Sequence, residues 1–368
     1  MLNFDNASTT KISKPSLDAF NFASEYFYNP SALYKPASQV KNLLEDDRLY
    51  LLKTLKGKTN SNFIFTGSAT ESNNAVLTSA VIRKDKKYLI SAGEHSSIHA
   101  KAISLKEQGY NIQFIPLLSN GAVDIEKYKE MLDVSVAFVS IIHVSNETGA
   151  INDIKVLNQL AKKVNPNCLF HSDGVQALGK IDINLKDLGV DFYTISAHKI
   201  NGPKGVGALY IANTSKFKPF IIGGGQENNL RAGTENVAGI HAFIEAVKNL
   251  KKHDLKPNKD AILNNLKGNY IVVSNKDCVD NIISICFKGV RGETILHMLE
   301  SKGYLIGTGS SCNSKAQYNR VISQLVPNDY ISGAIRISFD NEIQIEDCIN
   351  LTNAINEAVK FYREKITK

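Results

Sequence analysis

Residues 62–81 read NFIFTGSATESNNAVLTSAV, and this stretch decides how the chain folds. The apolar run Asn62–Thr66 predicts a buried strand, and Glu71–Val81 predicts a helix. The small residues between them predict a tight turn that leads from the strand into the helix. A strand, a turn and a helix in this order form the repeating unit of a doubly wound sheet, whose ligands bind in the loops after the strands.

The same alternation extends on both sides of this stretch. Further short apolar runs predict strands at Tyr88–Ser91, Ile112–Pro116, Val136–His143, Cys168–Asp173, Phe192–Ser196 and Gly207–Ala212. Helices are predicted at Val40–Leu55, Ile98–Gln108 and Val156–Val164. Strands and helices that alternate at this spacing predict an α/β fold with a mostly parallel sheet flanked by helices.

The composition of the chain changes after about Leu250. The polar stretch 251–260 contains Pro257 and predicts a boundary. Beyond it, strands are predicted at Ile282–Phe287 and Ala334–Phe339, and helices at Glu293–Lys302 and Ile345–Lys365. We therefore expect a large domain over residues 12–250 and a smaller α+β domain formed by residues 1–11 and 251–368.

The chain has 368 residues and a formal net charge of +7. Lysines and acidic residues are interspersed, so the charge predicts a solvated surface that attracts acidic partner proteins. No basic stripe with interleaved aromatic residues indicates direct binding of nucleic acid. The most apolar stretch, Val134–Val144, is too short to span a membrane and contains polar residues. We expect neither a nucleic acid nor a membrane as a direct partner.

Signals for secretion and for metal binding are not found in the sequence. Met1–Asp5 has neither the basic nor the apolar region of a secretory signal. The five cysteines include no C-x-x-C pair, so neither a disulfide framework nor a zinc site is expected. These observations predict a cytoplasmic protein without a bound metal.

The turn at residues 66–74, TGSATESNN, has the features of an anion site. Small residues allow close approach to the backbone, and a helix N-terminus offers free N–H groups and the positive end of a dipole. Ser68 and Glu71 also match a capping box. Taken alone, the stretch is compatible with a phosphate site and with a simple capped helix.

A lysine follows another predicted strand in residues 195–205, ISAHKINGPKG. Lys199 lies just past the strand end, where a doubly wound sheet places its reactive groups. Lysine forms Schiff bases with carbonyl cofactors once burial or a neighbouring cation lowers its pKa. An isolated lysine in a turn would be read as a surface residue, so the neighbouring motifs have to decide.

Three further strand ends carry polar groups. Asp173 ends one strand, and an acid that pairs with a pyridinium nitrogen makes pyridoxal phosphate an electron sink; it could equally cap the next helix. Residues 94–97 (EHSS) and 145–149 (SNETG) follow two other strands. Because the carboxyl ends of parallel strands share one edge, we expect these groups to converge there.

Taken together, these stretches resemble the NifS/IscS-type cysteine desulfurases, a group of fold type I pyridoxal-phosphate enzymes in the class V aminotransferase family. The resemblance runs along nearly the whole chain, and the S-x-H-K motif with its G-P-K-G continuation is its most specific part. The matching stretches are residues 5–10, 29–31, 67–74, 94–95, 146–149, 173–176, 196–199, 223–227, 231–234, 309–312 and 335–338.

The resemblance implies a role for each residue around the cofactor ring. Lys199 would carry pyridoxal 5′-phosphate covalently and move the proton on the substrate Cα. His95 would stack on the ring and assist that transfer. Asp173 would pair with the ring nitrogen, and Gln176 would bind the ring oxygen.

The resemblance also assigns the anionic groups. The phosphate would be held by Thr70, Ser196 and His198, together with Thr234 from the second subunit of a homodimer. The carboxylate of the L-cysteine substrate would be bound by Asn146 and Arg336, and guanidinium allows a bidentate contact.

Cys312 is the residue that separates a desulfurase from its relatives. It lies in the polar stretch 308–315, TGSSCNSK, whereas Cys286 lies among apolar residues, as structural cysteines do. A reactive thiol needs exposure and nearby positive charge, which Lys315 or Arg320 would supply. The resemblance implies that Cys312 attacks the substrate sulfur, holds it as a persulfide, and passes it to an acceptor of iron–sulfur cluster assembly or tRNA thiolation.

The chain departs from the family pattern at three places. Asn228 and Asn229 replace a usual Arg-Gly pair, Tyr34 replaces a usual His, and the segment between Cys312 and Arg336 is shortened. Three alternatives therefore stay open: a selenocysteine lyase, another class V lyase or aminotransferase, and a non-catalytic scaffold homologue.

Overall fold

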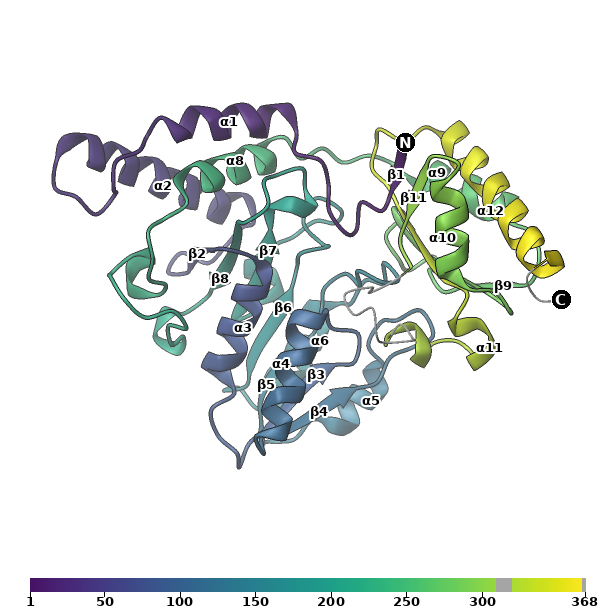
Figure 1. Cartoon of the computed structure of the whole chain (residues 1–368). Helices are drawn as coiled ribbons and strands as arrows, with labels where there is room; N and C mark the ends of the chain where they lie inside the picture. The colour runs from purple at the N-terminus through teal and green to yellow at the C-terminus, as the bar shows by residue number, and fades with distance from the viewer. Residues whose placement is uncertain (309–319, 366–368) are drawn as a thin grey trace.

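The computed structural model describes residues 1–308 and 320–365, and its centre is a seven-stranded sheet in the order β2-β8-β7-β6-β5-β3-β4 (Figure 1). Strand β8 is antiparallel to β2 and β7, and all other neighbours are parallel. The predicted α/β fold with a mostly parallel sheet is confirmed. The strands are β2 (Asn62–Thr66), β3 (Lys87–Ser91), β4 (Asn111–Ile115), β5 (Val136–Ser140), β6 (Leu169–Asp173), β7 (Phe192–Ser196) and β8 (Gly207–Ile211).

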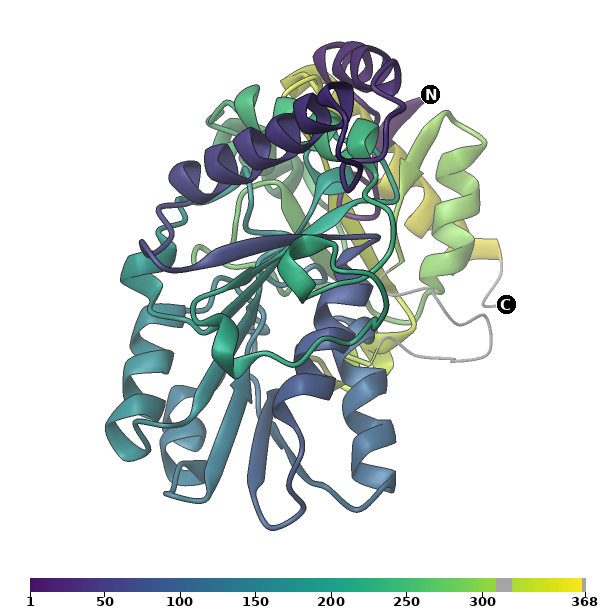
Figure 2. The ribbon, with the colours of Figure 1, turned by 90° about the vertical axis from the view of Figure 1, so that its left-hand side faces the viewer.

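Helices cover both faces of this sheet (Figure 2). Side chains alternate between the two faces along β2: Phe63 and Phe65 belong to one apolar cluster and Ile64 to another. The cluster with Ile64 packs under α3 (Ala69–Ala80) and α4 (Ser96–Glu107). The opposite cluster packs under α2 (Lys35–Thr54), α6 (Ile154–Val164) and α8 (Val237–Lys248).

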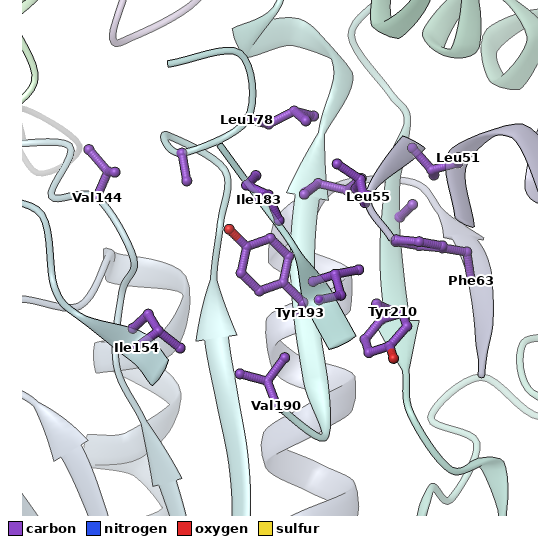
Figure 3. Packing of buried hydrophobic residues seen from close by; sticks show 14 of the residues in the cluster. Leu51, Leu55, Phe63, Val144, Ile154, Leu178, Ile183, Val190, Tyr193 and Tyr210 are labelled. Atoms are coloured by element: carbon purple, nitrogen blue, oxygen red, sulfur yellow. The ribbon is translucent and has the colours of Figure 1, made fainter. Parts of the chain in front are cut away.

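Figure 3 shows the second of these clusters at close range, where the aromatic rings of β2, β7 and β8 meet. The ring centres of Phe63 and Tyr210 lie 5.5 Å apart. Leu51 of α2 and Leu55 just after it close the cluster from the helix side. A sheet buried on both faces explains why its strands appear in the sequence as nearly continuous apolar runs.

A second, smaller group of elements lies beside this layered part, on the right in Figure 1. An antiparallel sheet in the order β12-β10-β9 packs with its helices around a separate apolar cluster. The chain's first strand, β1, pairs with β11 in the same group. The elements are β1 (Leu2–Phe4), β9 (Tyr270–Val272), β10 (Ile282–Phe287), β11 (Tyr304–Ile306), β12 (Ala334–Ser338), α9 (Lys256–Asn265), α10 (Gly292–Glu300), α11 (Asn328–Ile331) and α12 (Ile345–Lys365).

Strands β2, β7 and β10 and helix α12 have the predicted bounds. The polar stretch 251–260 was expected to be a boundary, but its second half forms the first turn of α9. Pro257 is compatible with that helix because a proline in the first turn has no N–H bond to lose. The sequence predicted none of α1 (Lys14–Ser24), α5 (Ile125–Met131), α7 (Leu185–Leu188) and α8. The domain boundaries stay a prediction.

The longest helices, α2 and α12, have 20 and 21 residues, and both carry several charged side chains. Within residues 1–308 and 320–365, no helix combines the length and the apolar character that crossing a membrane requires. The large buried apolar residues of both helices belong to the apolar clusters of the fold.

A fully buried histidine lies in the central sheet. His171 of β6 contacts the hydroxyl of Ser140 through Nδ1 at 3.0 Å and that of Thr194 through Nε2 at 3.1 Å. Burial lowers the pKa of His171 from 6.5 to about 3. The fold therefore requires this side chain to be neutral.

Acidification is expected to destabilise the protein through His171. Between pH 6.5 and about 3 the unfolded chain binds a proton that the folded chain does not, so the free energy of unfolding falls as the pH drops. At a pH of about 5, the loss from this residue is about 2 kcal/mol. His171→Asn should flatten the pH dependence of the unfolding midpoint, measured by chemical denaturation at each pH.

The exposed His253 is the control, and His253→Asn should keep the pH dependence of the parent protein. A His171→Asn protein that loses stability as steeply as the parent over the same pH range would contradict this account.

Candidate active site

Four strands end at one edge of the central sheet. The parallel strands β3, β5, β6 and β7 end at Ser91, Ser140, Asp173 and Ser196. Because parallel strands point the same way, the loops after them are neighbours. Most of the predicted site residues lie on these loops.

Lys199 ends the short 3₁₀ turn Ala197–Lys199, directly after β7. Its Nζ donates to the carbonyl oxygens of Ala7 and Ser8, at 2.6 and 2.5 Å. Both acceptors belong to the N-terminal segment, residues 5–10, which runs from β1 in the smaller group to the edge of the large sheet (Figure 1). The amino group of Lys199 is therefore held at the sheet edge.

Asp173 is buried at the end of β6, with 2% of its surface exposed. Its Oδ2 accepts a hydrogen bond from Asn73 Nδ2 at 2.8 Å, and its Oδ1 accepts one from the backbone N–H of Val175 at 3.0 Å. In the described part of the chain, no cationic side chain lies within 4 Å of this carboxylate. A buried carboxylate with only neutral donors is suited to a cationic partner such as a protonated ring nitrogen.

His95 is joined to Asp173 by a chain of side chains. Asn73 Nδ2 also donates to Ser97 Oγ at 2.9 Å, and Ser97 Oγ lies 2.9 Å from His95 Nδ1. The backbone N–H of Ser97 also donates to Nδ1 at 3.2 Å, so Nδ1 is an acceptor and the His95 ring proton is on Nε2. Burial lowers the pKa of His95. His95 is thus a neutral ring with a defined tautomer.

A second buried carboxyl group lies close by. Glu94 is 1% exposed, and its Oε1 accepts a hydrogen bond from Ser140 Oγ at 3.0 Å. Burial, followed by repulsion from Asp173, raises its pKa well above the usual range. The surroundings of Glu94 therefore disfavour a second negative charge beside Asp173.

The structure brings Gln176 to Lys199. Gln176 is buried, and its Nε2 donates to the carbonyl oxygen of Ala7 at 2.9 Å, the same oxygen that accepts from Lys199. Gln176 and Lys199 thus meet on one backbone carbonyl.

The predicted phosphate residues are only partly brought together. Helix α3 begins at the same edge, where Ser68 Oγ accepts from the Glu71 N–H at 3.2 Å, and its first-turn amides have no acceptor within the helix. Thr70 is exposed in that turn, and Ser196 is buried at the end of β7. His198 Nδ1 lies 3.2 Å from Thr9 Oγ1, and its pKa is lowered to about 4, mainly by burial.

Thr234 is not joined to the other phosphate residues by any hydrogen bond among the described residues. It is exposed in the loop between the 3₁₀ turn Glu227–Asn229 and α8. A role for Thr234 at the site of a second subunit requires this exposure.

Arg336 of β12 approaches the site from the smaller group of elements. Its Nη1 donates to the Asn146 carbonyl at 2.9 Å, and its Nη2 donates to Asp5 Oδ1 at 2.9 Å and Ser8 Oγ at 2.7 Å. Its buried Nε has no hydrogen-bond partner among the described residues. An unpaired N–H of this kind is costly unless a ligand such as a carboxylate accepts from it.

Cys312 lies outside the described residues. Before that segment, Gly307 pairs with Arg336 through two backbone hydrogen bonds of 2.9 and 2.7 Å. After it, the Arg320 guanidinium donates to the carbonyl oxygens of Ala92 and Glu94, just before His95. The described residues on either side of the segment therefore contact the same site.

Asn228 and Asn229, one of the departures from the family pattern, have a local physical explanation. Glu227, Asn228 and Asn229 have positive φ angles of 49°, 58° and 64°. Asparagine tolerates this left-handed region better than most residues other than glycine. Glu227 is fixed in it by a buried ion pair with Arg48, 2.7 Å between Oε2 and Nη1. Tyr34 precedes α2 and is half exposed.

Sequence reasoning assigned no role to three parts of the site: the N-terminal segment, Asn73 and Ser97. Asn73 was visible in the sequence three residues after Thr70, on the same side of α3. The contacts of Ala7 and Ser8 are made by backbone carbonyls, so no side-chain motif could reveal them.

The α/β fold and the polar groups at the carboxyl edge of its sheet point to one family of proteins, and comparison of the sequence with known families confirms that family. The profile of the family described as aminotransferase class-V matches residues 2–351. The chain therefore belongs to the class V aminotransferase family, as its motifs predicted.

Within this family, the chain is similar to proteins described as cysteine desulfurases and NifS-like proteins. The chain is 35% identical to the cysteine desulfurase IscS of Dictyoglomus turgidum, over 96% of this chain and 93% of the relative. It is 33% identical to cysteine desulfurase IscS 1 of Archaeoglobus fulgidus, over 85% and 84% of the two chains. Among solved structures, a NifS-like protein matches with a TM-score of 0.88 at 29% identity, over 98% of this chain and 99% of that chain. A NifS-like protein from Rickettsia africae matches with a TM-score of 0.86 at 30% identity, over 98% and 99%.

Enzymes of this family depend on pyridoxal phosphate, which confirms the predicted cofactor. The residues present fit it: Lys199 at the sheet edge, the Asp173 carboxylate, which has no cationic partner among the described residues, and the first turn of α3, whose amides have no acceptor within the helix. The individual roles of these residues stay predictions.

Lys199→Ala is expected to abolish the visible absorbance of the lysine-bound cofactor, because among the described residues Lys199 is the lysine whose amino group the Ala7 and Ser8 carbonyls hold at the sheet edge. The measurement is an absorbance spectrum after reconstitution with pyridoxal phosphate. Lys204→Ala removes an exposed lysine five residues further on and serves as the control. A Lys199→Ala protein that keeps the band, with its pyridoxal phosphate still bound to the chain, would show that another lysine carries the cofactor.

Arg336→Lys is expected to raise KM for L-cysteine by roughly ten- to a hundredfold, because lysine keeps the charge but loses the planar set of donors. Steady-state kinetics are measured with L-cysteine and with cysteamine, which has no carboxylate. The comparison separates a loss of carboxylate binding from a general loss of activity. The control is Arg291→Lys, at an exposed position. An unchanged KM for L-cysteine would contradict the role of Arg336.

Proposed function

We propose that the protein is a cysteine desulfurase, which converts L-cysteine to L-alanine and retains the sulfur on Cys312. The observation that carries the proposal is the convergence of Lys199, Asp173, His95 and Arg336 at one sheet edge. The cysteine desulfurases among its relatives, which match along most of the chain, support it.

The substrate is held through its carboxylate. The unpaired Nε of Arg336 and the side-chain amide of Asn146 supply donors for it, and the backbone carbonyl of Asn146 holds Arg336 in place. Asp5 and Ser8 hold Nη2 of the guanidinium. The substrate Cα is thereby placed toward the edge where Lys199 lies.

The proton on Cα is moved by the chain's own groups. Lys199 takes this proton, and the neutral His95 ring, with its proton on Nε2, lies beside the reaction. When bound, pyridoxal phosphate supplies an electron sink for the pair of electrons left on carbon. The Asp173 carboxylate favours the positive charge on the ring nitrogen that this requires.

Sulfur transfer then needs a thiolate. Cys312 attacks the substrate sulfur, a sulfur–sulfur bond forms, and the carbon–sulfur bond breaks with its electrons left on carbon. The carbon takes up a proton, alanine is released, and a persulfide remains on Cys312. Arg320 places a guanidinium near this site and favours the thiolate.

We also propose a homodimer, a sulfur-acceptor protein of iron–sulfur cluster assembly or tRNA thiolation, and a cytoplasmic location. The exposure of Thr234 supports the dimer, as do the apolar side chains of Phe22, Phe27 and Leu33, which are 54%, 80% and 100% exposed. The net charge of +7 favours an acidic acceptor. The large domain of residues 12–250 and the small domain of residues 1–11 and 251–368 complete the proposal.

Cys312→Ser is expected to keep cofactor absorbance and cysteine binding but to lose persulfide formation. Alanine release from L-cysteine should fall on the order of a thousandfold, because serine cannot attack the sulfur. Alanine release from L-cysteine sulfinate should persist, since its sulfur group leaves without attack by a thiol. Both rates are measured as alanine formed, and the persulfide is measured by mass spectrometry of the intact chain.

The matched control is Cys278→Ser, which removes a buried thiol outside the site and should leave both rates unchanged. Sulfide release by Cys312→Ser at the parent rate would show that another group is the nucleophile.

A further inference from the structure

Hydrogen bonds connect Lys199 to a second lysine, which is not among the residues predicted to bind the cofactor. Lys180 follows Gln176 by four residues, and its Nζ donates to Gln176 Oε1 at 3.0 Å. Gln176 Nε2 donates to the Ala7 carbonyl at 2.9 Å, and this oxygen also accepts from Lys199 Nζ at 2.6 Å. Lys180 is therefore the outer member of a continuous chain that ends at Lys199.

Neither packing nor an ion pair explains why a lysine occupies position 180. Part of the residue reaches solvent, but its amino group is enclosed, and its pKa is lowered to about 7, first by burial and then by Lys199. Within the described part of the chain, no carboxylate lies within 4 Å of its Nζ; Gln176 is its hydrogen-bond partner. An enclosed amino group without an acid costs stability, so another benefit has to offset it.

The partners of Gln176 determine how its amide is turned. A lysine ammonium can only donate, and a backbone carbonyl can only accept. Gln176 must therefore present Oε1 to Lys180 and Nε2 to Ala7. An amide nitrogen has two hydrogens, so the second one stays available for a further acceptor.

We propose that Lys180 is a positioning residue that clamps the Gln176 amide, so that its second Nε2 hydrogen is directed to the ring oxygen of the cofactor. The inference rests on the proposed roles of Gln176 and Lys199. Loss of Lys180 leaves Gln176 Oε1 buried and unpaired, so the amide loses its fixed orientation. It also removes an amino group that interacts electrostatically with Lys199.

The test measures the absorbance of the lysine-bound cofactor as a function of pH, without any substrate. A donor and a positive charge near the ring oxygen favour its anionic form, so their removal makes the bound cofactor hold its proton to higher pH. Lys180→Met should raise the midpoint of the absorbance change by roughly one pH unit. It should also weaken cofactor binding about tenfold. Lys180→Arg, which can still donate to Oε1, should restore the parent midpoint.

The unfolding temperature of the cofactor-free protein shows whether Lys180 positions Gln176 or only stabilises the fold. Lys180→Met removes an enclosed amino group without an acid but leaves Gln176 Oε1 unpaired, so the two effects oppose each other and its unfolding temperature should stay close to that of the parent protein. Lys186→Met, at an exposed position of α7, is the control and should change neither the absorbance midpoint nor the unfolding temperature.

Two results would overturn the proposal. The first is an absorbance midpoint in Lys180→Met at the same pH as in the parent protein. The second is an equal shift of that midpoint in Lys180→Met and Lys180→Arg, together with an unfolding temperature of Lys180→Met below that of the parent. Because no cysteine is used, a parent protein that shows the band but releases no sulfur would contradict the proposed function and leave this inference standing.

Discussion

The site depends on the position of one short piece of backbone, the N-terminal segment of residues 5–10. The Ala7 carbonyl accepts from both Lys199 and Gln176, and Ser8 contributes its carbonyl to Lys199 and its hydroxyl to Arg336. The segment can reach both sides because β1, just before it, pairs with β11 of the smaller group. Lys199, which follows β7 of the large sheet, and Arg336 of the smaller group are thereby held at a fixed separation.

Charge is distributed unevenly around this segment, and burial is the cause. Burial disfavours the charged forms of His95, His198 and Glu94, because their surroundings solvate charge poorly. Asp173 has hydrogen-bond donors on both oxygens and no cationic partner among the described residues. A site with neutral neighbours and one uncompensated buried carboxylate suits a cofactor that brings its own positive charge.

Much of the fold could be predicted because strands buried on both faces are continuous apolar runs, as in Phe192–Ser196. Helix α8 escaped prediction because most of its surface is buried, its polar face is reduced to His241, Glu245 and Lys248, and its Gly239 weakens the helical signal. In the site, Lys199 and Asp173 follow strand ends, so the rule for parallel sheets located them. The contacts of Ala7 are made by backbone atoms from a distant segment, and the bond from Lys180 to Gln176 depends on how a turn packs, so neither leaves a recognisable motif.

The central claim is that Lys199, held by the N-terminal segment, is the residue that carries pyridoxal phosphate. The most direct measurement is reduction of the reconstituted protein with borohydride, followed by peptide mass spectrometry, because reduction fixes the cofactor on the lysine that holds it. The account predicts that the phosphopyridoxyl group is found on the peptide that contains Lys199. Its recovery on Lys180, on Lys204 or on any other lysine, or on none, would contradict the account.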